Sequence, residues 1–182
     1  FNIEEVQKAG AVFDSAKLDW INNHHLAALS FDAFNERLAP FLESVGIDCT
    51  QKVNSKEIVA AMRSSKPTLL GVARDLIPYF SDVESYDEKA ANKFLIGSEP
   101  VLEFVQRKLN GLEIWNEESI DHALKEAQTS LSLPTPKLNQ PIRIAMTGST
   151  QSPSLGLTLS LFDSVEVNKR IDAALKYLAN SN

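Results

Sequence analysis

The residues best suited to chemistry are one arginine and the turn rich in hydroxyls and amides that follows it. Arg143 stands in the run Pro141-Ile-Arg-Ile-Ala-Met-Thr-Gly148, and the next residues are Ser149-Thr-Gln-Ser-Pro-Ser-Leu155. Residues 127–162 contain no carboxylate, so Arg143 and Lys137 have no local counter-charge. A guanidinium beside hydroxyls and amides favours an anionic ligand that also offers hydrogen-bonding edges.

A second window without acids could add to this surface. Residues 58–74 contain no carboxylate and carry three cations, Arg63, Lys66 and Arg74. The formal net charge of −6 argues against a general nucleic-acid binder, because phosphate affinity comes from lysine and arginine. If the two windows join on one face, however, they form a local RNA site on an acidic protein. Two alternatives remain open: chance clustering of charge, and a structural salt bridge from Arg143 to Glu126 or Asp163.

No constellation of residues in the sequence supports catalysis. There is no glycine-rich phosphate loop and no nucleophile elbow. His24 and His25 are adjacent and would point in different directions on a helix, and no third ligand stands at metal spacing. The single cysteine, Cys49, can form neither an internal disulfide nor a thiolate cluster. We therefore expect no catalytic residue and no metal site, and a hydrolase using His24 or His122 lacks a paired nucleophile and base.

The elements that must position these residues have helical periodicity nearly throughout, and strand signals are absent. Apolar stripes follow residues that can cap a helix start, namely Ser30, Asn54, Thr68, Asp87, Ser98 and Asn116. The two prolines in residues 132–136 predict an extended link that leads into the Arg143 segment. Two further helices, over residues 155–162 and 165–178, are predicted to end the chain.

Two blocks of this sequence resemble a known family. The run P-I-R-I-A-M-T-G, then Q-S-P-S-L, then V-N-K-R-I-D-A-A-L, is similar to the C-terminal anticodon-binding region of bacterial glutamyl-tRNA synthetases. Residues Phe13 to Leu26, F-D-S-A-K-L-D-W-I-N-N-H-H-L, are similar to the segment that follows the catalytic core in that family. The blocks come in the family's order and at about its spacing, so the resemblance covers nearly the whole chain.

The resemblance implies an all-α fold, a two-lobed helical bundle or cage of the class I glutamyl-tRNA synthetase anticodon-binding type. We expect residues 1–28 to form a stem-contact segment, residues 29–86 a first helical anticodon-binding lobe and residues 87–182 a second one. A shift in composition at residues 81–87 is the reason for placing the joint there.

The resemblance also assigns roles in tRNA binding to residues near the C-terminal block. In the family, the arginine matched by Arg143 faces the anticodon bases. The loop matched by Pro153 and Leu155 packs against another anticodon base, with turn chemistry alone as the alternative interpretation. Apart from the resemblance, the charge of Lys137 alone leads us to expect that it contacts phosphate.

The turn before Thr68-Leu69 departs from the family pattern. Many members carry, three residues before the matching Thr-Leu pair, an arginine that reads the third anticodon base, and here that position is Ser65. Lys66 and Arg63 keep positive charge nearby, but the planar fork at that position is lost. Discrimination between glutamate and glutamine tRNAs is therefore expected to be weaker, and a shift in alignment is the alternative.

The N-terminal block admits two interpretations. By resemblance, Lys17, Trp20, Asn22 and Asn23 abut the tRNA stem. By chemistry alone, Leu18, Trp20 and Ile21 are predicted to be core, with Lys17 and Asn22 on a solvated face.

Taken together, these features predict the tRNA-binding portion of a glutamate–tRNA ligase. The parent enzyme activates glutamate with ATP and transfers it to the tRNA 3′ end; ATP and Mg belong to that parent, and we expect no cofactor in this portion. The expected partners are tRNA(Glu) and, as an open second choice, tRNA(Gln), with no DNA and no membrane. We expect a cytoplasmic monomer, excised or processed from a longer protein whose activating motifs lie before Phe1. The alternative is an acidic all-α protein-interaction adaptor.

Overall fold

The chain folds into helices joined by short loops. The computed structural model describes residues 13–51 and 54–181, and no strand is present among them, which confirms the all-α prediction. The elements are α1 (Ser15–Ala28), α2 (Phe31–Ser44), the 3-10 turn η2 (Cys49–Gln51), α3 (Ser55–Met62), α4 (Leu69–Phe80), α5 (Glu88–Ala90), the π-helical turn η3 (Ala91–Leu95), α6 (Glu99–Asn110), α7 (Glu117–Leu131), α8 (Thr135–Thr147), α9 (Leu155–Ser160) and α10 (Ser164–Ser181). Within the described ranges, no helix is long and apolar enough to cross a membrane.

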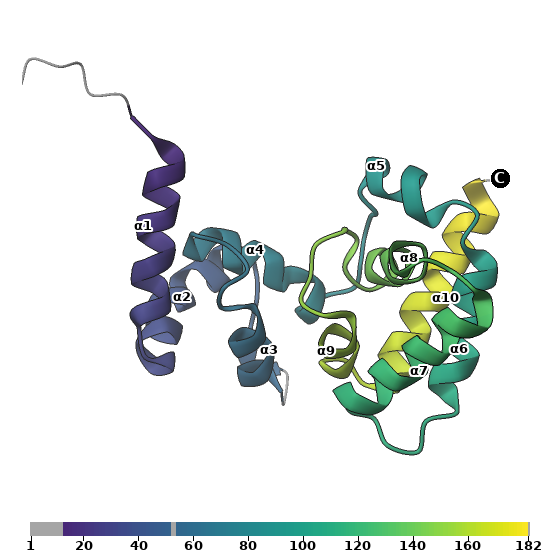
Figure 1. Cartoon of the computed structure of the whole chain (residues 1–182). Helices are drawn as coiled ribbons and strands as arrows, with labels where there is room; N and C mark the ends of the chain where they lie inside the picture. The colour runs from purple at the N-terminus through teal and green to yellow at the C-terminus, as the bar shows by residue number, and fades with distance from the viewer. Residues whose placement is uncertain (1–12, 52–53, 182) are drawn as a thin grey trace, which may run out of the picture.

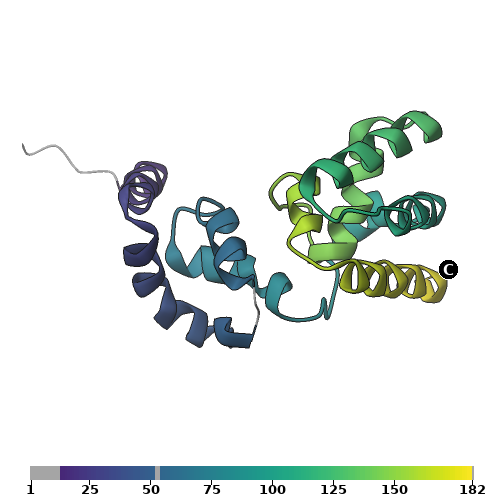
Figure 2. The same ribbon diagram turned by 90° about the horizontal axis from the view of Figure 1, so that it is seen from below.

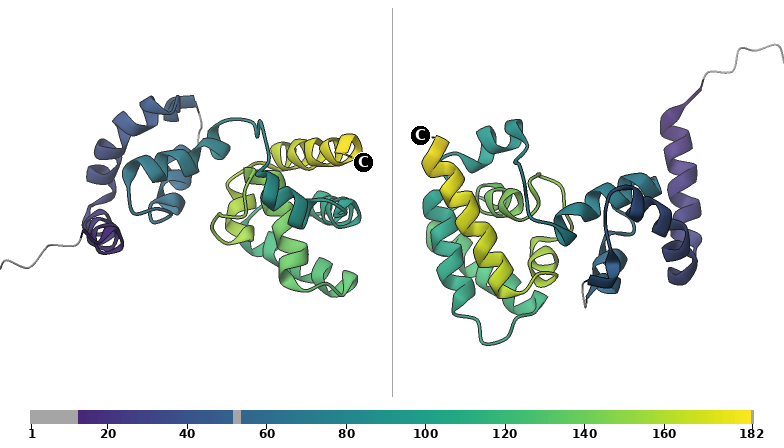
Figure 3. Two further views of the ribbon diagram at one scale, coloured as in Figure 1. Left: turned by 90° about the horizontal axis from the view of Figure 1, so that it is seen from above. Right: turned by 180° about the vertical axis from the view of Figure 1, so that it is seen from behind.

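The helices form two groups. Elements α1 to α4 make the first group and elements α5 to α10 the second, and residues 81–87 connect them (Figure 1). In the second group α8 contacts η3, α6, α9 and α10, and it also contacts α4 of the first group. The same division is visible from below, from above and from behind (Figures 2 and 3). The domain boundaries expected from the sequence, 28/29 and 86/87, stay predictions.

Most of the predicted helix starts carry the expected side-chain cap. The side chains of Ser30, Thr68, Asp87 and Asn116 each accept a hydrogen bond from a backbone N–H three residues onward. Asn54 precedes a helix as predicted, but its Nδ2 donates to the carbonyl of Leu161, 2.8 Å away in the second group. Asn54 thus connects the two groups instead of capping α3.

The link before the Arg143 segment is shorter than the predicted extended stretch over residues 132–136. Helix α8 begins at Thr135, and Pro136 lies in its first turn, where proline's missing N–H leaves no bond unmade. Arg143 is therefore held on a helix whose buried face includes Ile142, Ile144 and Met146, each 0% exposed. The last two helices begin within one residue of their predicted starts, at Leu155 and Ser164.

Helix α1 buries much less than its apolar residues suggest. Leu18, Trp20 and Ile21 are 50%, 70% and 36% exposed, so the prediction that they are core is wrong for this chain. Leu26 is the buried residue of α1, and it faces the first helical group near the α1–α2 turn. The Trp20 ring stacks on His24, with ring centroids 5.9 Å apart.

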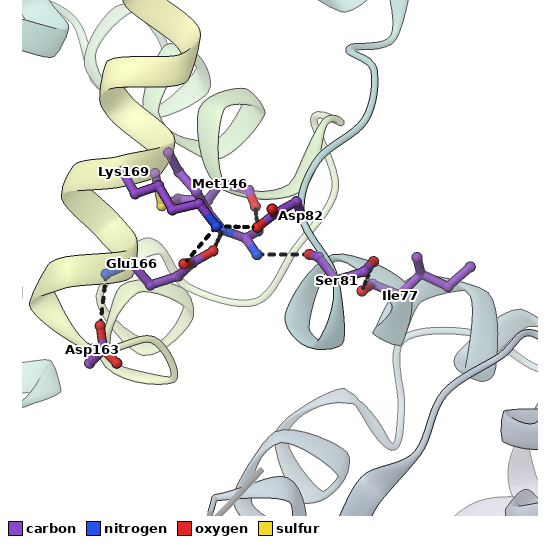
Figure 4. A network of polar contacts seen from close by, with 8 residues as sticks. Ile77, Ser81, Asp82, Met146, Asp163, Glu166 and Lys169 are labelled. Atoms are coloured by element: carbon purple, nitrogen blue, oxygen red, sulfur yellow. Dashed lines mark hydrogen bonds and ion pairs between the residues drawn. The ribbon is translucent and has the colours of Figure 1, made fainter. Parts of the chain in front are cut away.

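A buried arginine on α10, Arg170, connects the second group to the residues that join the groups, and Figure 4 labels its partners Ser81, Met146 and Glu166. Arg170 is 4% exposed, and its Nε donates to Glu166 Oε1 at 2.6 Å. Its Nη2 donates to the carbonyl of Ser81 at 2.9 Å, and its Nη1 donates to the carbonyl of Met146. Arg170 thus contacts α10, the end of α8 and the residue directly after α4.

An aromatic stack lies beside the same arginine. Tyr79, on α4, is 1% exposed and stacks on Phe162 of the second group, with ring centroids 5.3 Å apart and planes 5° apart. The Arg170 guanidinium lies over the Phe162 ring, 4.4 Å from its centroid. Burial raises the pKa of the Tyr79 hydroxyl above its ordinary value. The two helical groups therefore meet through buried, directional contacts.

Candidate nucleic-acid interface

The two acid-free windows meet where the helical groups face each other. Lys66, in the turn between α3 and α4, donates from Nζ to Gln151 Oε1 at 2.7 Å, and Gln151 lies in the loop of residues 149–154 between α8 and α9. A pocket of about 460 Å³ lies between this turn and this loop. Its described lining consists of Ala61, Met62, Ser64, Ser65, Asp75, Thr150, Gln151, Ser152 and Pro153.

Arg143 holds the loop wall of this pocket. Its Nη1 donates to the carbonyl of Ser152 at 2.7 Å, to the Ser152 hydroxyl at 2.8 Å and to the carbonyl of Pro153 at 2.9 Å. The Ser152 hydroxyl also bonds with Thr158 Oγ1 on α9 at 2.9 Å. The loop geometry therefore depends on one guanidinium, which α8 positions.

Arg143 does not form the salt bridge to Glu126 or Asp163 that the sequence left open as an alternative. Glu126 instead pairs with Lys108 at 3.1 Å, and Asp163 accepts from the backbone N–H of Glu166 at 2.7 Å. The interaction of Arg143 with the protein runs through neutral oxygens of the 149–154 loop.

Part of the Arg143 guanidinium remains without a protein acceptor. Nε is buried and has no hydrogen-bond partner, and Nη2 donates to none of the residues that the structure describes. Burial lowers the pKa of Arg143 below its ordinary value, which the nearby Tyr79 partly opposes, and a guanidinium stays protonated at neutral pH. An unpaired buried donor costs free energy, and the protein leaves this guanidinium only partly satisfied.

The other two residues predicted near this loop have different environments. Pro153 lines the pocket, as expected for a wall that a base could pack against. Leu155 is only 4% exposed at the start of α9, so it supports the loop from the core and offers little open surface.

Of the three residues predicted in the α3–α4 turn, two lie at the pocket and one points away. Ser65 lines the pocket, and Lys66 stands at its edge. Arg63 donates from Nη2 to the carbonyls of Leu26 at 3.0 Å and Ala27 at 3.1 Å, and also to that of Leu29. Arg63 therefore fixes the turn between α1 and α2.

The remaining predicted residues lie elsewhere. Asn22 donates from Nδ2 to the carbonyl of Pro67, which places α1 against the α3–α4 turn, and Lys17 is exposed on α1. Lys137 is exposed in the first turn of α8 and lines a separate pocket of about 360 Å³ with Phe94 and other residues. The structure thus gathers Arg143, Pro153, Ser65 and Lys66, and sets Lys17 and Lys137 apart.

Sequence reasoning missed Asp75 and gave Gln151 no separate role. Asp75 is the first residue after the acid-free window of residues 58–74, so the window itself hid it. Its Oδ2 lies 3.7 Å from Lys66 Nζ. Among the described residues, no group of three His, Cys, Asp or Glu side chains could hold a metal ion.

Comparisons with known proteins find relatives that align with nearly the whole of this chain. Residues 33–175 match the family described as anticodon binding domain. The chain is 34% identical over 180 residues to glutamate–tRNA ligase 2 of Coxiella burnetii and 33% identical to glutamate–tRNA ligase 1 of another strain of that organism. Each alignment covers 98% of this chain and 38% of the relative, so the chain spans less than half the length of these relatives.

Two solved structures have a similar fold. A glutamate tRNA ligase from Elizabethkingia meningosepticum, in complex with its amino acid, has a TM-score of 0.79 and covers 98% of this chain and 35% of its own length. A glutamate-tRNA synthetase from Elizabethkingia anophelis has a TM-score of 0.76, covering 97% of this chain and 34% of its own. Both are 22% identical to this chain, a likeness that concerns the fold.

Proposed function

The chain belongs to the anticodon binding domain family, and we propose that it binds the anticodon loop of tRNA as one part of a glutamate–tRNA ligase. In this proposal the rest of the parent enzyme, which activates glutamate with ATP and Mg and transfers it to the tRNA, lies outside the chain. The primary ligand is tRNA(Glu), and tRNA(Gln) is the second candidate. The parent is proposed to act as a monomer in the cytoplasm. The comparisons give no support to the alternative of an acidic interaction adaptor.

The observation that carries the proposal is the pocket between the two helical groups. Its lining combines apolar side chains with hydroxyls, an amide and the Asp75 carboxylate. Arg143 holds the loop wall of the pocket through Nη1 and keeps Nη2 without an acceptor among the described residues. Sequence-specific RNA recognition uses splayed, single-stranded bases that stack on such surfaces and bond along their edges. A pocket of about 460 Å³ lies in the size range of ligand sites in proteins.

We assign roles to the predicted residues according to where they lie. Arg143, Ser65, Lys66 and Pro153 contact the bases, and Leu155 supports their loop. Arg63 acts indirectly by fixing the α1–α2 turn. Lys137 contacts phosphate on one side of the pocket, and Lys17 and Asn22 contact the tRNA stem on the other. Residues 1–28 form the stem-contact segment. The two anticodon-binding lobes are residues 29–86 and residues 87–182.

The test is anticodon-dependent binding at one stated salt concentration. We expect the purified chain to bind a tRNA(Glu) transcript more tightly than the same transcript with all three anticodon bases exchanged, as measured by fluorescence anisotropy. The affinity should fall as salt rises, because the complex includes phosphate contacts. Equal affinity for the two transcripts would overturn the proposal.

A further inference from the structure

The side chain of Gln151 is held in one orientation at the wall of the pocket. Gln151 is exposed in the 149–154 loop and lines the pocket between the two helical groups. Its Oε1 accepts a hydrogen bond from Lys66 Nζ at 2.7 Å. An ammonium group can only donate, so it selects the oxygen of the amide, and the Nε2 end points away from Lys66.

Lys66 is itself fixed by its surroundings. A Cβ on Gly71 would lie 2.8 Å from Lys66 Cβ, so the Lys66 side chain packs closely over the first turn of α4. Its Nζ lies 3.7 Å from Asp75 Oδ2. Asp75, the carboxylate of this pocket, is thereby engaged by the same ammonium group that orients Gln151.

The backbone at Gln151 is held as well. Its N–H donates to Ser149 Oγ at 3.3 Å, and Ser149 Oγ donates to its carbonyl at 3.3 Å. Arg143 holds the carbonyl of the next residue, Ser152, at 2.7 Å. The position of the Gln151 amide therefore follows from contacts on both its backbone and its side chain.

Gln151 in this orientation presents two donors to a ligand. None of the residues that the structure describes accepts a hydrogen bond from its Nε2, so both N–H groups remain available. Ser65, which lines the pocket from the α3–α4 turn, adds a hydroxyl that can also donate. A base is favoured here if it turns acceptors toward these groups.

Cytosine is the base whose pairing edge fits adjacent donors. Its N3 and O2 are neighbouring acceptors, whereas the acceptors of uracil are separated by N3–H and adenine has a single ring acceptor on that edge. Guanine turns the donors N1–H and N2–H₂ outward at the corresponding positions. Donors that face donors leave both sides unpaired, which costs binding free energy.

This difference separates the two candidate tRNAs. Glutamate codons begin with guanine and glutamine codons begin with cytosine, so the third anticodon base is cytosine in tRNA(Glu) and guanine in tRNA(Gln). We propose that Gln151 is a specificity-determining residue that selects cytosine at this position, and that Lys66 is a positioning residue that keeps the amide nitrogen of Gln151 toward the base. The inference rests on the proposed function, because it takes this pocket as the place where one anticodon base is bound.

The experiment compares tRNA(Glu) transcripts that carry cytosine or guanine at the third anticodon position and are otherwise identical. Dissociation constants are measured by fluorescence anisotropy at one salt concentration for the wild-type chain and for Gln151→Glu, which keeps the side-chain shape but replaces the amide donors by an acceptor. We expect wild type to bind the cytosine transcript roughly tenfold more tightly, the lower end of the scale of a bidentate base contact, and Gln151→Glu to lose or reverse that preference. An unchanged preference in Gln151→Glu would overturn the inference.

Two further variants separate base selection from general charge. Asn92→Asp, at an exposed residue of η3 outside the pocket lining, adds the same charge and should weaken both transcripts equally; loss of the cytosine preference in this variant would contradict the inference. Lys66→Met frees the Gln151 amide to rotate, so it should reduce the cytosine preference in addition to weakening both transcripts, and an unchanged preference would contradict the positioning role. If wild type distinguishes anticodons but not these two bases, the inference alone fails; if it shows no anticodon dependence at all, the proposed function fails.

Discussion

Arg143 uses only some of its donors within the protein. Nη1 holds the carbonyls of Ser152 and Pro153, while Nη2 has no acceptor in the described part of the chain. Arg143→Ala should therefore weaken tRNA(Glu) binding by about 1 to 3 kcal/mol, the scale of a bidentate base contact. It should also lower the free energy of unfolding by about 1 to 3 kcal/mol, because loop oxygens lose a charged donor.

Arg143→Lys separates these two effects. Lysine keeps the charge but lacks the planar fork, so it can restore part of the loop contact without restoring base recognition. We expect its urea unfolding midpoint to recover more than its dissociation constant. If both variants have a lower urea unfolding midpoint but the folded protein binds tRNA(Glu) with wild-type affinity, the role of Arg143 is to hold the 149–154 loop and not to contact a base.

Ser65 gives a second prediction at this scale. Ser65 and Asp75 line the same pocket, so Ser65→Arg would place a planar guanidinium beside the carboxylate and offer two donors to a base that presents acceptors. We expect the variant to prefer tRNA(Glu) over tRNA(Gln) more strongly than wild type does, by about 1 to 3 kcal/mol. This preference is measured by competition of the two tRNAs for the protein at one salt concentration. Equal and strong discrimination by both proteins would mean that another residue reads that base.

Lys137 should act through charge alone. It is exposed in the first turn of α8, and no described carboxylate pairs with it. Lys137→Ala should lower the slope of log affinity against log salt by about one and leave base preference unchanged. A titration series over several salt concentrations, with Arg143→Ala as the contrasting variant, measures both quantities. An altered base preference with an unchanged slope would contradict this role.

At the residue scale, local charge patterns in the sequence located part of the site, but they did not show where a long side chain would reach. The acid-free windows pointed to Lys66 and Arg143. This succeeded because the turn that carries Lys66 contacts, through Gln151, the loop that follows the helix of Arg143. Arg63 could not be placed from its window, since a long side chain can reach back to the carbonyls of another helix, here Leu26 and Ala27. Asp75 was missed because nothing in the sequence shows that it faces the same pocket as Ser65.

At the element scale, the end of α8 is a point where geometry permits only glycine. Gly148 has φ +73°, and a Cβ there would lie 2.8 Å from the carbonyl oxygen of Ser85. Gly148→Ala should lower the free energy of unfolding by at least about 1 to 2 kcal/mol, the cost of the left-handed conformation alone. Because Gly148 joins α8 to the 149–154 loop, tRNA binding should weaken as well.

A matched control exists at the end of α6. Gly111 has φ −86°, and the nearest atom to an added Cβ is 3.5 Å away, so Gly111→Ala should change stability little. Urea unfolding of both variants, followed by far-UV circular dichroism, measures the difference. Equal losses in the two variants would show that the close approach to Ser85 does not matter.

The helices were largely predictable because their signals are local. Caps such as Ser30 and Thr68 act within one turn, so their effect can be seen in the sequence. The link before α8 was predicted too long, since a proline favours a loop and a first helical turn equally well, as Pro136 shows. The exposure of Trp20 was not predictable, because burial depends on which elements lie opposite a helix face.

At the scale of the whole molecule, the pocket exists only if the two helical groups keep their relative position. One wall comes from the α3–α4 turn and the other from the 149–154 loop. Tyr79 stacks on Phe162 across the joint, and Arg170 covers the outer face of that stack while bonding to the carbonyl of Ser81. Rotation about residues 81–87 would break several buried contacts together.

Arg170→Met should therefore impair both folding and tRNA binding. Removing one partner of a buried ion pair costs about 3 to 5 kcal/mol of unfolding free energy. The loss in Arg170→Met should approach that range without exceeding it, because its partner Glu166 is 24% exposed and water can solvate the carboxylate left behind. Lys169→Met is the control: it removes a neighbouring cation whose contact with Asp82 is exposed, so it should change stability little. If folded Arg170→Met binds tRNA(Glu) with wild-type affinity and anticodon preference, the joint does not position the pocket.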